Sequence, residues 1–504
     1  MTAGSSTAAA HGSAVREFPE LFIGGEWVRP HSGRVIASVD PSTEQVWAEV
    51  AEADAADVDA AVAAARAALE GPWGGKVTPT QRGALLLRLA ELVRRDADVL
   101  SDIETSDNGK TLRDTRGEML RAADWLTFYA GAADKIRGAH VPVNDDTLAY
   151  TRREPVGVVG AILPWNSPIS LASWKLGPAL AAGNTVVLKP AELTPASALH
   201  LARLVQEAGF PPGVVNVVPG YGETAGAALA AHPDVDKISF TGEHHTARKI
   251  MQSAAVNLKR CSFECGGKSP FLVFDDADLD RAITIAVHSA FRSTGQSCSL
   301  ASRAFVQRGV YERFATAVAE RADRIRVGPP REPRTHIGPH TSADQLAKTM
   351  SYISSAREDG FRLLAGGDRP ADLEHGYYVR PTVFADVDNG SRLAQEEVFG
   401  PVLAVIPFDT EDDAVEMAND TRYGLVGGLF TGDVGRAHRV AARIRTGLVS
   451  VNTFRPIHPS LPYGGFKLSG LGRENGLEVL DEYTELKSVV IDLSSEPAGD
   501  PFAG

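Results

Sequence analysis

The sequence predicts a large α/β protein built on two parallel sheets. Its 504 residues exceed what one hydrophobic core usually organises, so we expect two or three domains. From Pro155 onward, short apolar runs alternate with helical stretches, which indicates strands of a parallel sheet joined by helices. A similar rhythm resumes after Glu264 and predicts a second α/β domain.

The N-terminal part is expected to be mainly helical. A strand at Leu21–Ile23 enters a turn at Gly24-Gly25, and residues 139–154 alternate around an Asn-Asp-Asp turn as a projecting hairpin would. Strong turn chemistry marks Asp107–Lys110. Apolar spacing predicts helices over 54–69, 80–100, 112–136 and 196–208. Strands are expected over 156–163, 185–188, 214–218 and 237–240, and then near 270–274, 303–307, 402–407 and 448–451.

Composition limits the classes of partner. The chain has 51 Lys and Arg against 64 Asp and Glu, a net charge of −13, and no basic run long enough to follow a phosphate backbone. Neither nucleic acid nor an anionic membrane is therefore expected as a partner. Three cysteines give no disulfide framework and fit a reducing cytoplasm. Because no apolar run could span a bilayer and residues 1–16 lack the core of a signal peptide, we expect a cytoplasmic protein with a disordered tail over 1–17.

The most informative segment surrounds Cys298. Residues 291–303 read Phe-Arg-Ser-Thr-Gly-Gln-Ser-Cys-Ser-Leu-Ala-Ser-Arg, so the cysteine follows a Gly-Gln pair among small polar residues. A cysteine kept for packing usually has apolar neighbours, whereas a nucleophilic thiolate needs a tight turn, polar donors and access for substrate. Cys298 is therefore the predicted nucleophile.

Two further segments could supply partners for this cysteine. Glu264 stands among apolar residues and before Gly266-Gly267, which suits a general base with a raised pKa, although a surface glutamate before a turn gives the same pattern. Asn166, between Pro164 and Pro168, offers a fixed amide that could stabilise an oxyanion.

Two other patterns carry less information. Gly220–Ala225 fits the G-x-G-x-x-G/A fingerprint of dinucleotide binding and equally fits a tight turn before a helix. His244-His245 and the Cys261/Cys265 pair lack the companion ligands of a metal site in the sequence, so no metal is predicted.

Taken together, these segments resemble the NAD(P)-dependent aldehyde dehydrogenase superfamily of the hydrolytic, non-CoA-acylating type, from about residue 18 to 492. The resemblance implies an aldehyde dehydrogenase-like α/β fold with two Rossmann-related parallel-sheet domains and a small β oligomerisation element. Independent motifs occur in the family's order: the Asn166 loop, Lys189–Glu192, Phe240–Gly242, the Glu264 and Cys298 segments, Glu397–Phe399 and Gly464–Lys467.

The resemblance also implies how the chain is divided. The cofactor-binding domain would comprise 18–137, 155–263 and 467–483, and the catalytic domain would comprise 264–466. Residues 138–154 and 484–504, with an edge strand near 485–493, would form the oligomerisation element of a homodimer or homotetramer.

By this resemblance, Cys298 attacks the aldehyde to form a thiohemiacetal, while Asn166 and the backbone N–H of Cys298 hold the oxyanion. Hydride then passes to the nicotinamide, and Glu264 activates the water that hydrolyses the resulting thioester. Lys175 is the family position that supports the asparagine and nearby catalytic groups. The implied product is a carboxylic acid, and no histidine is needed beside the cysteine.

The resemblance extends to the cofactor. Lys189 and Glu192 match the positions that hold the adenine ribose, and a carboxylate there favours NAD over NADP, although some relatives accept both. Glu397 matches the ligand of the nicotinamide ribose. The implied cofactor-binding residues are Ile162, Leu163, Pro164, Trp165, Lys189, Glu192, Thr241, Gly242, Glu243, Cys265, Gly266, Glu397 and Phe399.

The chain departs from the family pattern at four positions. Glu243 stands where many relatives carry a serine that caps a helix over the pyrophosphate, and Ala247 stands where a second glycine is common. Because a carboxylate repels phosphate, we expect Glu243 to turn outward. Cys265 replaces a leucine and Ser293 replaces an asparagine, and neither change removes a catalytic group.

The resemblance does not identify which aldehyde is the substrate. Semialdehyde-oxidising relatives have an arginine at the position of Arg292 that pairs with a distal carboxylate, although Arg292 could equally form a structural ion pair. Trp174 stands where succinate semialdehyde enzymes have a second arginine. We expect an aldehyde with a polar or acidic far end. The expected substrate pocket comprises Arg121, Ser167, Trp174, Arg292, Ser297, Arg455, Ile457, His458 and Tyr463.

Three alternatives remain at this point. Cys, Asn and Glu alone could support acyl transfer in a thioesterase or hydrolase that uses no nicotinamide. CoA-acylating relatives typically lack the water-activating glutamate, so Glu264 favours a free acid. A protein that kept the fold and lost the chemistry is disfavoured because Cys298, Glu264 and Asn166 are all present.

Overall fold

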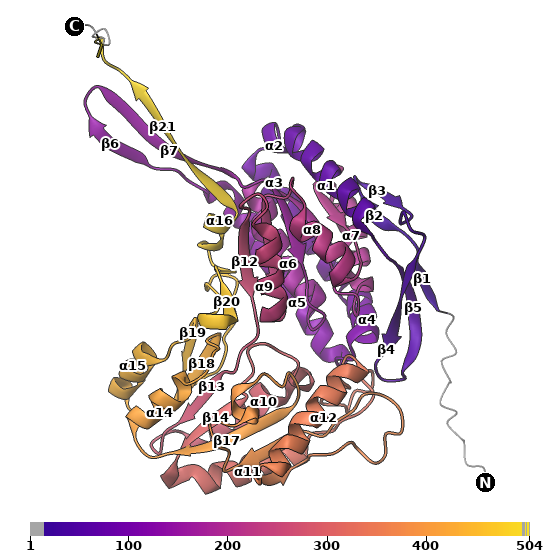
Figure 1. The fold of residues 1–504 in the computed structure, drawn as a ribbon, viewed down its shortest axis with the longest axis vertical. Coiled ribbons are helices and arrows are strands. Elements are labelled where there is room, and N and C mark those ends of the chain that lie inside the picture. Colours follow the sequence, from indigo (N-terminus) through magenta and orange to yellow (C-terminus); the bar gives the residue numbers. More distant parts are fainter. Residues whose placement is uncertain (1–14, 496–498, 500, 503–504) are drawn as a thin grey trace.

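The computed structural model describes residues 15–495, 499 and 501–502, and two large open sheets dominate it (Figure 1). The first sheet has the order β20-β12-β11-β8-β9-β10-β2-β3, in which the five strands from β12 to β10 run parallel and the flanking pairs run antiparallel. Its strands are β2 (Leu21–Ile23), β3 (Glu26–Val28), β8 (Val158–Ile162), β9 (Thr185–Lys189), β10 (Val215–Val217), β11 (Lys237–Thr241), β12 (Arg260–Glu264) and β20 (Gly470–Leu471).

The second sheet has the order β15-β16-β17-β14-β13-β18-β19 and is parallel apart from the β15–β16 pair. The α/β fold with two parallel sheets is therefore confirmed. Its strands are β13 (Pro270–Val273), β14 (Arg303–Gln307), β15 (Arg362–Ala365), β16 (Thr382–Ala385), β17 (Val402–Phe408), β18 (Val426–Phe430) and β19 (Leu448–Val451).

Two three-stranded sheets complete the strands. β6 (His140–Asn144), β7 (Thr147–Pro155) and β21 (Thr484–Asp492) form an antiparallel sheet that projects from the body of the molecule. β1 (Arg16–Phe18), β5 (Gln45–Ala51) and β4 (Val35–Asp40) form the other. Order therefore begins before the predicted Phe18, because β1 pairs with β5 from Arg16 onward. The rest of the predicted tail, residues 1–14, lies outside the described residues, as do 496–498, 500 and 503–504 of the predicted oligomerisation element.

The helices surround the two sheets (Figure 1). Those of the first half are α1 (Ala55–Glu70), α2 (Pro72–Gly75), α3 (Pro79–Arg95), α4 (Ala97–Asn108), α5 (Leu112–Ala132), η1 (Ala133–Lys135), α6 (Pro168–Ala182), α7 (Ala196–Ala208), η2 (Gly222–Gly226), α8 (Ala227–Ala231) and α9 (His244–Ala254). Those of the second half are α10 (Leu279–Phe291), η3 (Arg292–Gly295), η4 (Arg308–Val310), α11 (Tyr311–Asp323), α12 (Ala343–Glu358), α13 (Arg392–Gln395), α14 (Glu411–Asn419), α15 (Val434–Arg443), η5 (Lys467–Ser469) and α16 (Val479–Glu482).

Two local predictions were wrong in part. The helix expected over 80–100 is divided at Asp96, whose backbone is not helical and whose carboxylate contacts His200 Nε2 at 2.8 Å. The turn expected at Asp107–Lys110 is helical as far as Asn108, and Gly109 ends the helix with φ of +77°. Burial explains the second error, because the Asp107 carboxylate accepts hydrogen bonds from Ser38 Oγ and the Ala196 N–H.

The parallel topology places the functional segments. All five residues of β8 and of β11 are buried, as expected where helices cover both faces of a sheet. Ligands of open α/β sheets bind beyond the carboxyl ends of the strands, and here β8 leads into the Asn166 loop while β12 ends at Glu264. Residues 265–269 then cross directly to β13 in the second sheet. Within the described residues, no helix is both long and apolar enough to cross a membrane.

Candidate active site

Two cavities meet at Cys298, between the two large sheets. Asn166, Leu171, Thr241, Glu264 and Cys298 line both of them. We call the first the arginine cavity; it is also lined by Lys110, Glu118, Arg121, Trp125, Ser167, Ser170, Trp174, His288, Ser289, Arg292, Ser293, Gln296, Ser297, Ser299, Phe454, Arg455, Ile457 and Tyr463. We call the second the Glu397 cavity; it is also lined by Pro164, Trp165, Gly242, Glu243, Cys265, Gly266, Gln345, Lys348, Glu397 and Phe399.

An unusual backbone turn presents Cys298. Ser293, Thr294 and Gly295 have successive φ values of +54°, +57° and +67°, a left-handed conformation that only glycine adopts freely. Gly295 has no alternative, since a Cβ there would lie 2.2 Å from the carbonyl carbon of Gly400. Strain of this kind persists only where the surroundings fix it, and it is common at functional sites.

The thiol of Cys298 is partly buried and contacts a phenol. Its Sγ lies 3.8 Å from the hydroxyl oxygen of Tyr463. Burial raises the pKa of Cys298 to about 11, and the nearby carboxylates of Glu397 and Glu264 act in the same direction. The thiolate that would attack a substrate therefore depends on donors and cations around it.

Glu264, the last residue of β12, is buried with 5% of its surface exposed. Among the described residues its Oε2 has no hydrogen-bond partner, although it lines both cavities. Burial and the neighbouring charge of Glu474 raise the pKa of Glu264 well above its usual range. A carboxyl group with this environment is suited to accept a proton from water near neutral pH.

Two hydrogen-bond donors in the Cys298 region are candidates to hold an oxyanion. Asn166 is buried, and its Nδ2 donates to the carbonyl oxygen of Gln296 at 3.0 Å, which fixes the amide against the cysteine segment. In residues 15–495, no hydrogen-bond acceptor pairs with the backbone N–H of Cys298. Both groups can thus donate to the oxygen that becomes negative when the sulfur adds to a carbonyl carbon.

Lys175 is closed to solvent and makes its hydrogen bonds away from Asn166. Its ammonium donates to Ser239 Oγ at 3.0 Å and to Glu474 Oε1 at 2.5 Å, and not to Asn166. Lys175 nevertheless lowers the pKa of Glu264 by its charge. Glu474 was missed in the sequence because nothing near it marks chemistry, and only the fold brings it to Lys175.

The Glu397 cavity has a glycine cradle. The N–H of Gly267 donates to Glu397 Oε1 at 3.0 Å, and a Cβ at Gly266 would lie 2.0 Å from Glu397 Oε2. Trp165 and Phe399 meet edge to face with ring centroids 5.2 Å apart. Burial raises the pKa of Glu397 to about 7. A half-buried carboxylate beside two aromatic rings and glycine backbone fits the ribose and ring of a nucleotide.

Some predicted cofactor residues lie outside this cavity. Lys189 is buried, and its ammonium donates to the Pro190 carbonyl at 2.9 Å and lies 3.5 Å from Glu192 Oε2. Ile162 and Leu163 are buried in the core beside them. Gln345 and Lys348 line the cavity and were missed; Gln345 Nε2 donates to the carbonyl of Phe399 at 2.8 Å.

Glu243 does have companions that the sequence did not suggest. Its carboxylate and one ring nitrogen each from His244 and His245 lie within 4.8 Å of one another. The cluster lies at the N-terminus of α9, and the charges of Arg422 and Arg248 act on His244. A helix N-terminus and two arginines oppose a cation, so we assign no metal there. Glu243 lines the Glu397 cavity and is solvent-exposed, so its exposure agrees with the expectation that it turns outward.

The arginine cavity contains more cationic groups than carboxylates. Lys110 forms a buried ion pair with Glu118 and donates to Ser167 Oγ at 2.8 Å, and Arg292 lies 3.3 Å from Asp114. Arg121 and Arg455 form no ion pair within residues 15–495. Of the predicted pocket residues, only His458 does not line the cavity. Lys110, Glu118, Trp125, His288 and Phe454 line it and were not predicted.

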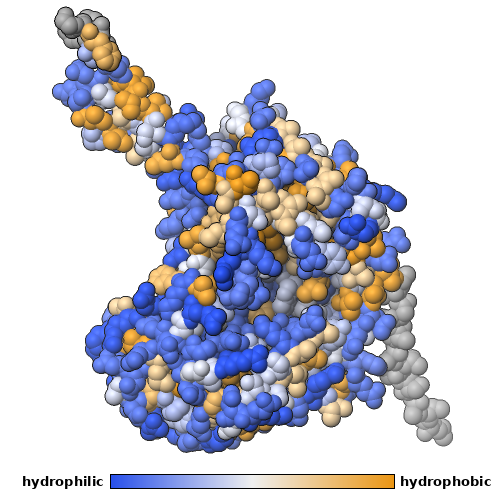
Figure 2. Space-filling model, viewed as in Figure 1, coloured by the Kyte–Doolittle hydropathy of each residue, from blue (hydrophilic) through white to orange (hydrophobic). Residues whose placement is uncertain are grey.

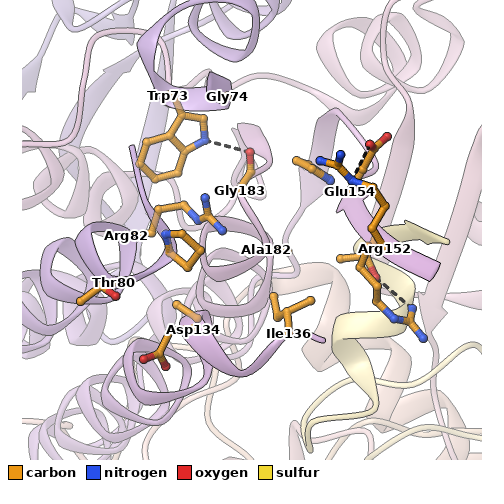
Figure 3. A pocket seen from close by; sticks show the side chains of 15 residues that line it. Trp73, Gly74, Thr80, Arg82, Asp134, Ile136, Arg152, Glu154, Ala182 and Gly183 are labelled. Atoms are coloured by element: carbon orange, nitrogen blue, oxygen red, sulfur yellow. Dashed lines mark hydrogen bonds and ion pairs between the residues drawn. The ribbon is translucent and has the colours of Figure 1, made fainter. Parts of the chain in front are cut away.

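A third cavity lies at the base of the projecting sheet (Figure 3), and Cys298 does not line it. Trp73 donates to the Gly183 carbonyl at 3.0 Å, Arg82 donates to two backbone carbonyls, and Arg152 pairs with Glu154. These polar groups are satisfied by the protein, so this cavity offers no comparable chemistry.

The sequence profile of the aldehyde dehydrogenase family matches residues 27–489. The chain belongs to this family. It is 48% identical over 470 residues to an aldehyde dehydrogenase of Emericella nidulans, covering 93% of this chain and 94% of that one. It is 46% identical to mouse aldehyde dehydrogenase 1A1, covering 95% of each chain. The chain is thus an oxidoreductase, an NAD(P)-dependent aldehyde dehydrogenase.

Solved structures of aldehyde dehydrogenases have the same fold. A Bacillus cereus aldehyde dehydrogenase variant superposes with a TM-score of 0.93 at 43% identity, covering 95% of this chain and 97% of that one. The betaine aldehyde dehydrogenase of Staphylococcus aureus, solved with NAD+, superposes with a TM-score of 0.94 at 37% identity, covering 96% and 97%.

Proposed function

We propose that this aldehyde dehydrogenase oxidises its substrate to a free carboxylic acid, with Cys298 as nucleophile and Glu264 as general base. The observation that carries the proposal is the position of Cys298, Glu264 and Asn166 on the wall shared by both cavities. An aldehyde in the arginine cavity and a nucleotide in the Glu397 cavity would meet at the sulfur.

Each residue has one task in this mechanism. The Cys298 sulfur adds to the carbonyl carbon, and Asn166 Nδ2 with the Cys298 N–H donates to the oxygen that becomes negative. Oxidation leaves a thioester on Cys298. Glu264 then takes a proton from water, whose oxygen attacks the thioester and releases the acid and the thiolate. The unpartnered Oε2 of Glu264 is the atom available for that proton.

NAD is the proposed cofactor, and it supplies the two-electron acceptor when bound. Glu397, the Gly266-Gly267 cradle, Trp165 and Phe399 would hold its nicotinamide end. Glu192, 36% exposed beside Lys189, would accept a hydrogen bond from the adenine ribose and disfavour a 2′-phosphate. The Staphylococcus aureus relative solved with NAD+ supports this choice.

The proposed substrate is an aldehyde with a carboxylate or another polar group at its far end. Arg121 and Arg455 face the arginine cavity without a carboxylate partner among the described residues, whereas Arg292 lies beside Asp114. A half-buried arginine without a counter-ion favours an anion from the substrate.

We also infer a homo-oligomer, a dimer or tetramer, that assembles through the projecting sheet. Figure 2 shows apolar side chains gathered on this sheet. Its exposed apolar residues are Val141, Val143, Leu148, Leu486, Val490, Ile491 and Leu493. Exposed apolar groups on unpaired strand edges favour association with a second copy.

Three variants test the mechanism. With NAD and a panel of aldehydes, Cys298→Ser should abolish formation of reduced nicotinamide, while Cys261→Ser, a thiol outside both cavities, should retain it. Glu264→Gln should allow one turnover and then retain an acyl group on Cys298, detectable by mass spectrometry. Turnover of Cys298→Ser would contradict the proposal. Activity that requires coenzyme A would favour a CoA-acylating enzyme. Ester hydrolysis without aldehyde oxidation would favour a thioesterase or hydrolase.

A further inference from the structure

Tyr463 is held rigidly beside the reactive sulfur. Its backbone exchanges two hydrogen bonds with Glu474, at 2.6 and 2.7 Å, and its ring packs edge to face on Trp174 with centroids 5.3 Å apart. Trp174 in turn stacks on Trp125, whose Nε1 donates to Asn475 Oδ1 at 2.7 Å. The phenol is 4% exposed, and its oxygen lies 3.8 Å from Cys298 Sγ.

Arg455 binds both hydroxyls that flank Cys298. Its Nη1 donates to Ser297 Oγ at 2.6 Å and to Ser299 Oγ at 2.9 Å. Ser299 is buried and lies close enough to the Tyr463 phenol to lower its pKa. A chain of polar groups thus runs from Arg455 through Ser299 to Tyr463 and ends at the sulfur.

The charges around Cys298 explain why its thiolate needs these polar groups. Glu264 at the end of β12 and Glu397 after α13 oppose ionisation of the thiol, and Cys265 lies on the same wall. The charge of Arg455 favours ionisation of the thiol, and Tyr463 is the only side-chain hydrogen-bond partner of Cys298 within residues 15–495. A partly buried thiolate needs such groups, since an unpaired charge removed from water is costly.

We propose that Tyr463 is a catalytic residue whose hydroxyl donates a hydrogen bond to the Cys298 thiolate, and that Arg455 is a positioning residue that acts through Ser299. The phenol keeps its proton, because burial raises the pKa of Tyr463 far above its usual range. Tyr463 therefore stabilises the thiolate as a donor and takes no part as a base. This inference rests on the proposed function only for the role of Cys298 as nucleophile.

The direct test is the pH profile of Cys298 alkylation by iodoacetamide in the full chain, without aldehyde or nucleotide, with the modified cysteine identified by mass spectrometry. Tyr463→Phe removes only the hydroxyl. Losing one hydrogen bond to a charged group should raise the pKa of the thiol and slow alkylation about tenfold below that pKa. Tyr311→Phe is the matched control, because its hydroxyl contacts Asp386 and Val405 away from both cavities and its loss should leave the profile unchanged.

A second pair of variants tests the role of Arg455 and guards against misfolding of Tyr463→Phe. Arg455→Met should raise the thiol pKa, and Arg455→Lys should restore part of the shift because the charge remains. An alkylation profile unchanged within about twofold in both Tyr463→Phe and Arg455→Met would overturn the inference. Failure of the proposed function would appear separately. In that case Cys298→Ser would still oxidise aldehydes, while Tyr463→Phe would still show the expected rise in the thiol pKa.

Discussion

Lys175 and Glu474, 299 residues apart in the chain, form an ion pair that is closed to solvent behind Glu264. Ser239 Oγ joins the pair, accepting from Lys175 at 3.0 Å and donating to Glu474 Oε1 at 3.2 Å. The charge of Glu474 raises the pKa of Glu264, and the charge of Lys175 lowers it. The pair therefore adjusts the proton affinity of the proposed general base.

Glu474→Gln tests this coupling. Removing the like charge and leaving Lys175 unpaired both lower the pKa of Glu264. Since the base acts when ionised, the acidic limb of the kcat profile should move to lower pH. The variant also leaves a buried ammonium without a counter-ion, so the free energy of unfolding should fall by about 3 kcal/mol. Steady-state kinetics against pH and urea unfolding measure the two effects.

The control for this variant is Glu207→Gln, which breaks a solvent-exposed pair with Arg95. Exposed pairs contribute less than about 1 kcal/mol, so stability should change little and the acidic limb should stay in place. An acidic limb that stays in place in Glu474→Gln as well would show that Glu264 is not coupled to the pair.

The sequence reveals the parts of the site that stand in local motifs. Cys298, Glu264 and Asn166 each occur in a short segment whose neighbours suit one task, and the three line one wall. Groups held only by tertiary contacts were missed. Glu474 reaches the site through its ion pair with Lys175, and Glu118 lines the arginine cavity through its ion pair with Lys110. No local sequence pattern indicates either pair.

The fold shows the same division. Strand and helix alternation predicted both parallel sheets, because apolar strands buried on both faces carry that signal locally. The break at Asp96 and the helical Asp107 depend on His200 and Ser38, which lie 104 and 69 residues away. Tertiary hydrogen bonds overrode local propensity at both positions.

Gly267→Ala should disable Cys298 without touching a catalytic group. A Cβ at Gly267 would lie 2.6 Å from the carbonyl oxygen of Cys298 and 3.1 Å from Leu425 Cβ, so the cysteine segment must move. A displacement of this size costs about 100-fold or more in kcat/KM. Gly131→Ala in α5, where a Cβ meets nothing within 4 Å, should keep full activity. Wild-type kcat/KM in Gly267→Ala would show that the contact is relieved harmlessly.

Arg121→Met should change substrate choice. If Arg121 binds a distal carboxylate, its loss should raise KM for carboxylated aldehydes about tenfold or more and leave kcat nearly unchanged. Uncharged aldehydes of similar length should be unaffected. Arg116→Met, on the same helix and paired with Asp98 outside the cavity, provides the control. Equal effects on charged and uncharged aldehydes would remove the support for an acidic substrate.

Glu192→Ser should relax the preference for NAD. The Glu192 carboxylate would oppose the 2′-phosphate of NADP, and Lys189 lies 3.5 Å away. Without the carboxylate, Lys189 is free to attract that phosphate, so KM should fall for NADP and rise for NAD. Parallel titrations with the two nucleotides at a fixed aldehyde concentration give both constants. A ratio of the two KM values that matches the wild type would place the adenine ribose elsewhere.

Val490→Asp should weaken self-association. Val490 is 68% exposed on β21, the edge strand of the projecting sheet, where its apolar surface would be buried against a second copy. An aspartate there would be desolvated without a partner, so the oligomer should dissociate at lower concentration. Light scattering after gel filtration measures the mass. Val434→Asp places the same charge on a 74% exposed valine of α15 and should leave the mass unchanged. If Val490→Asp keeps the wild-type mass at every concentration, this sheet is not the interface.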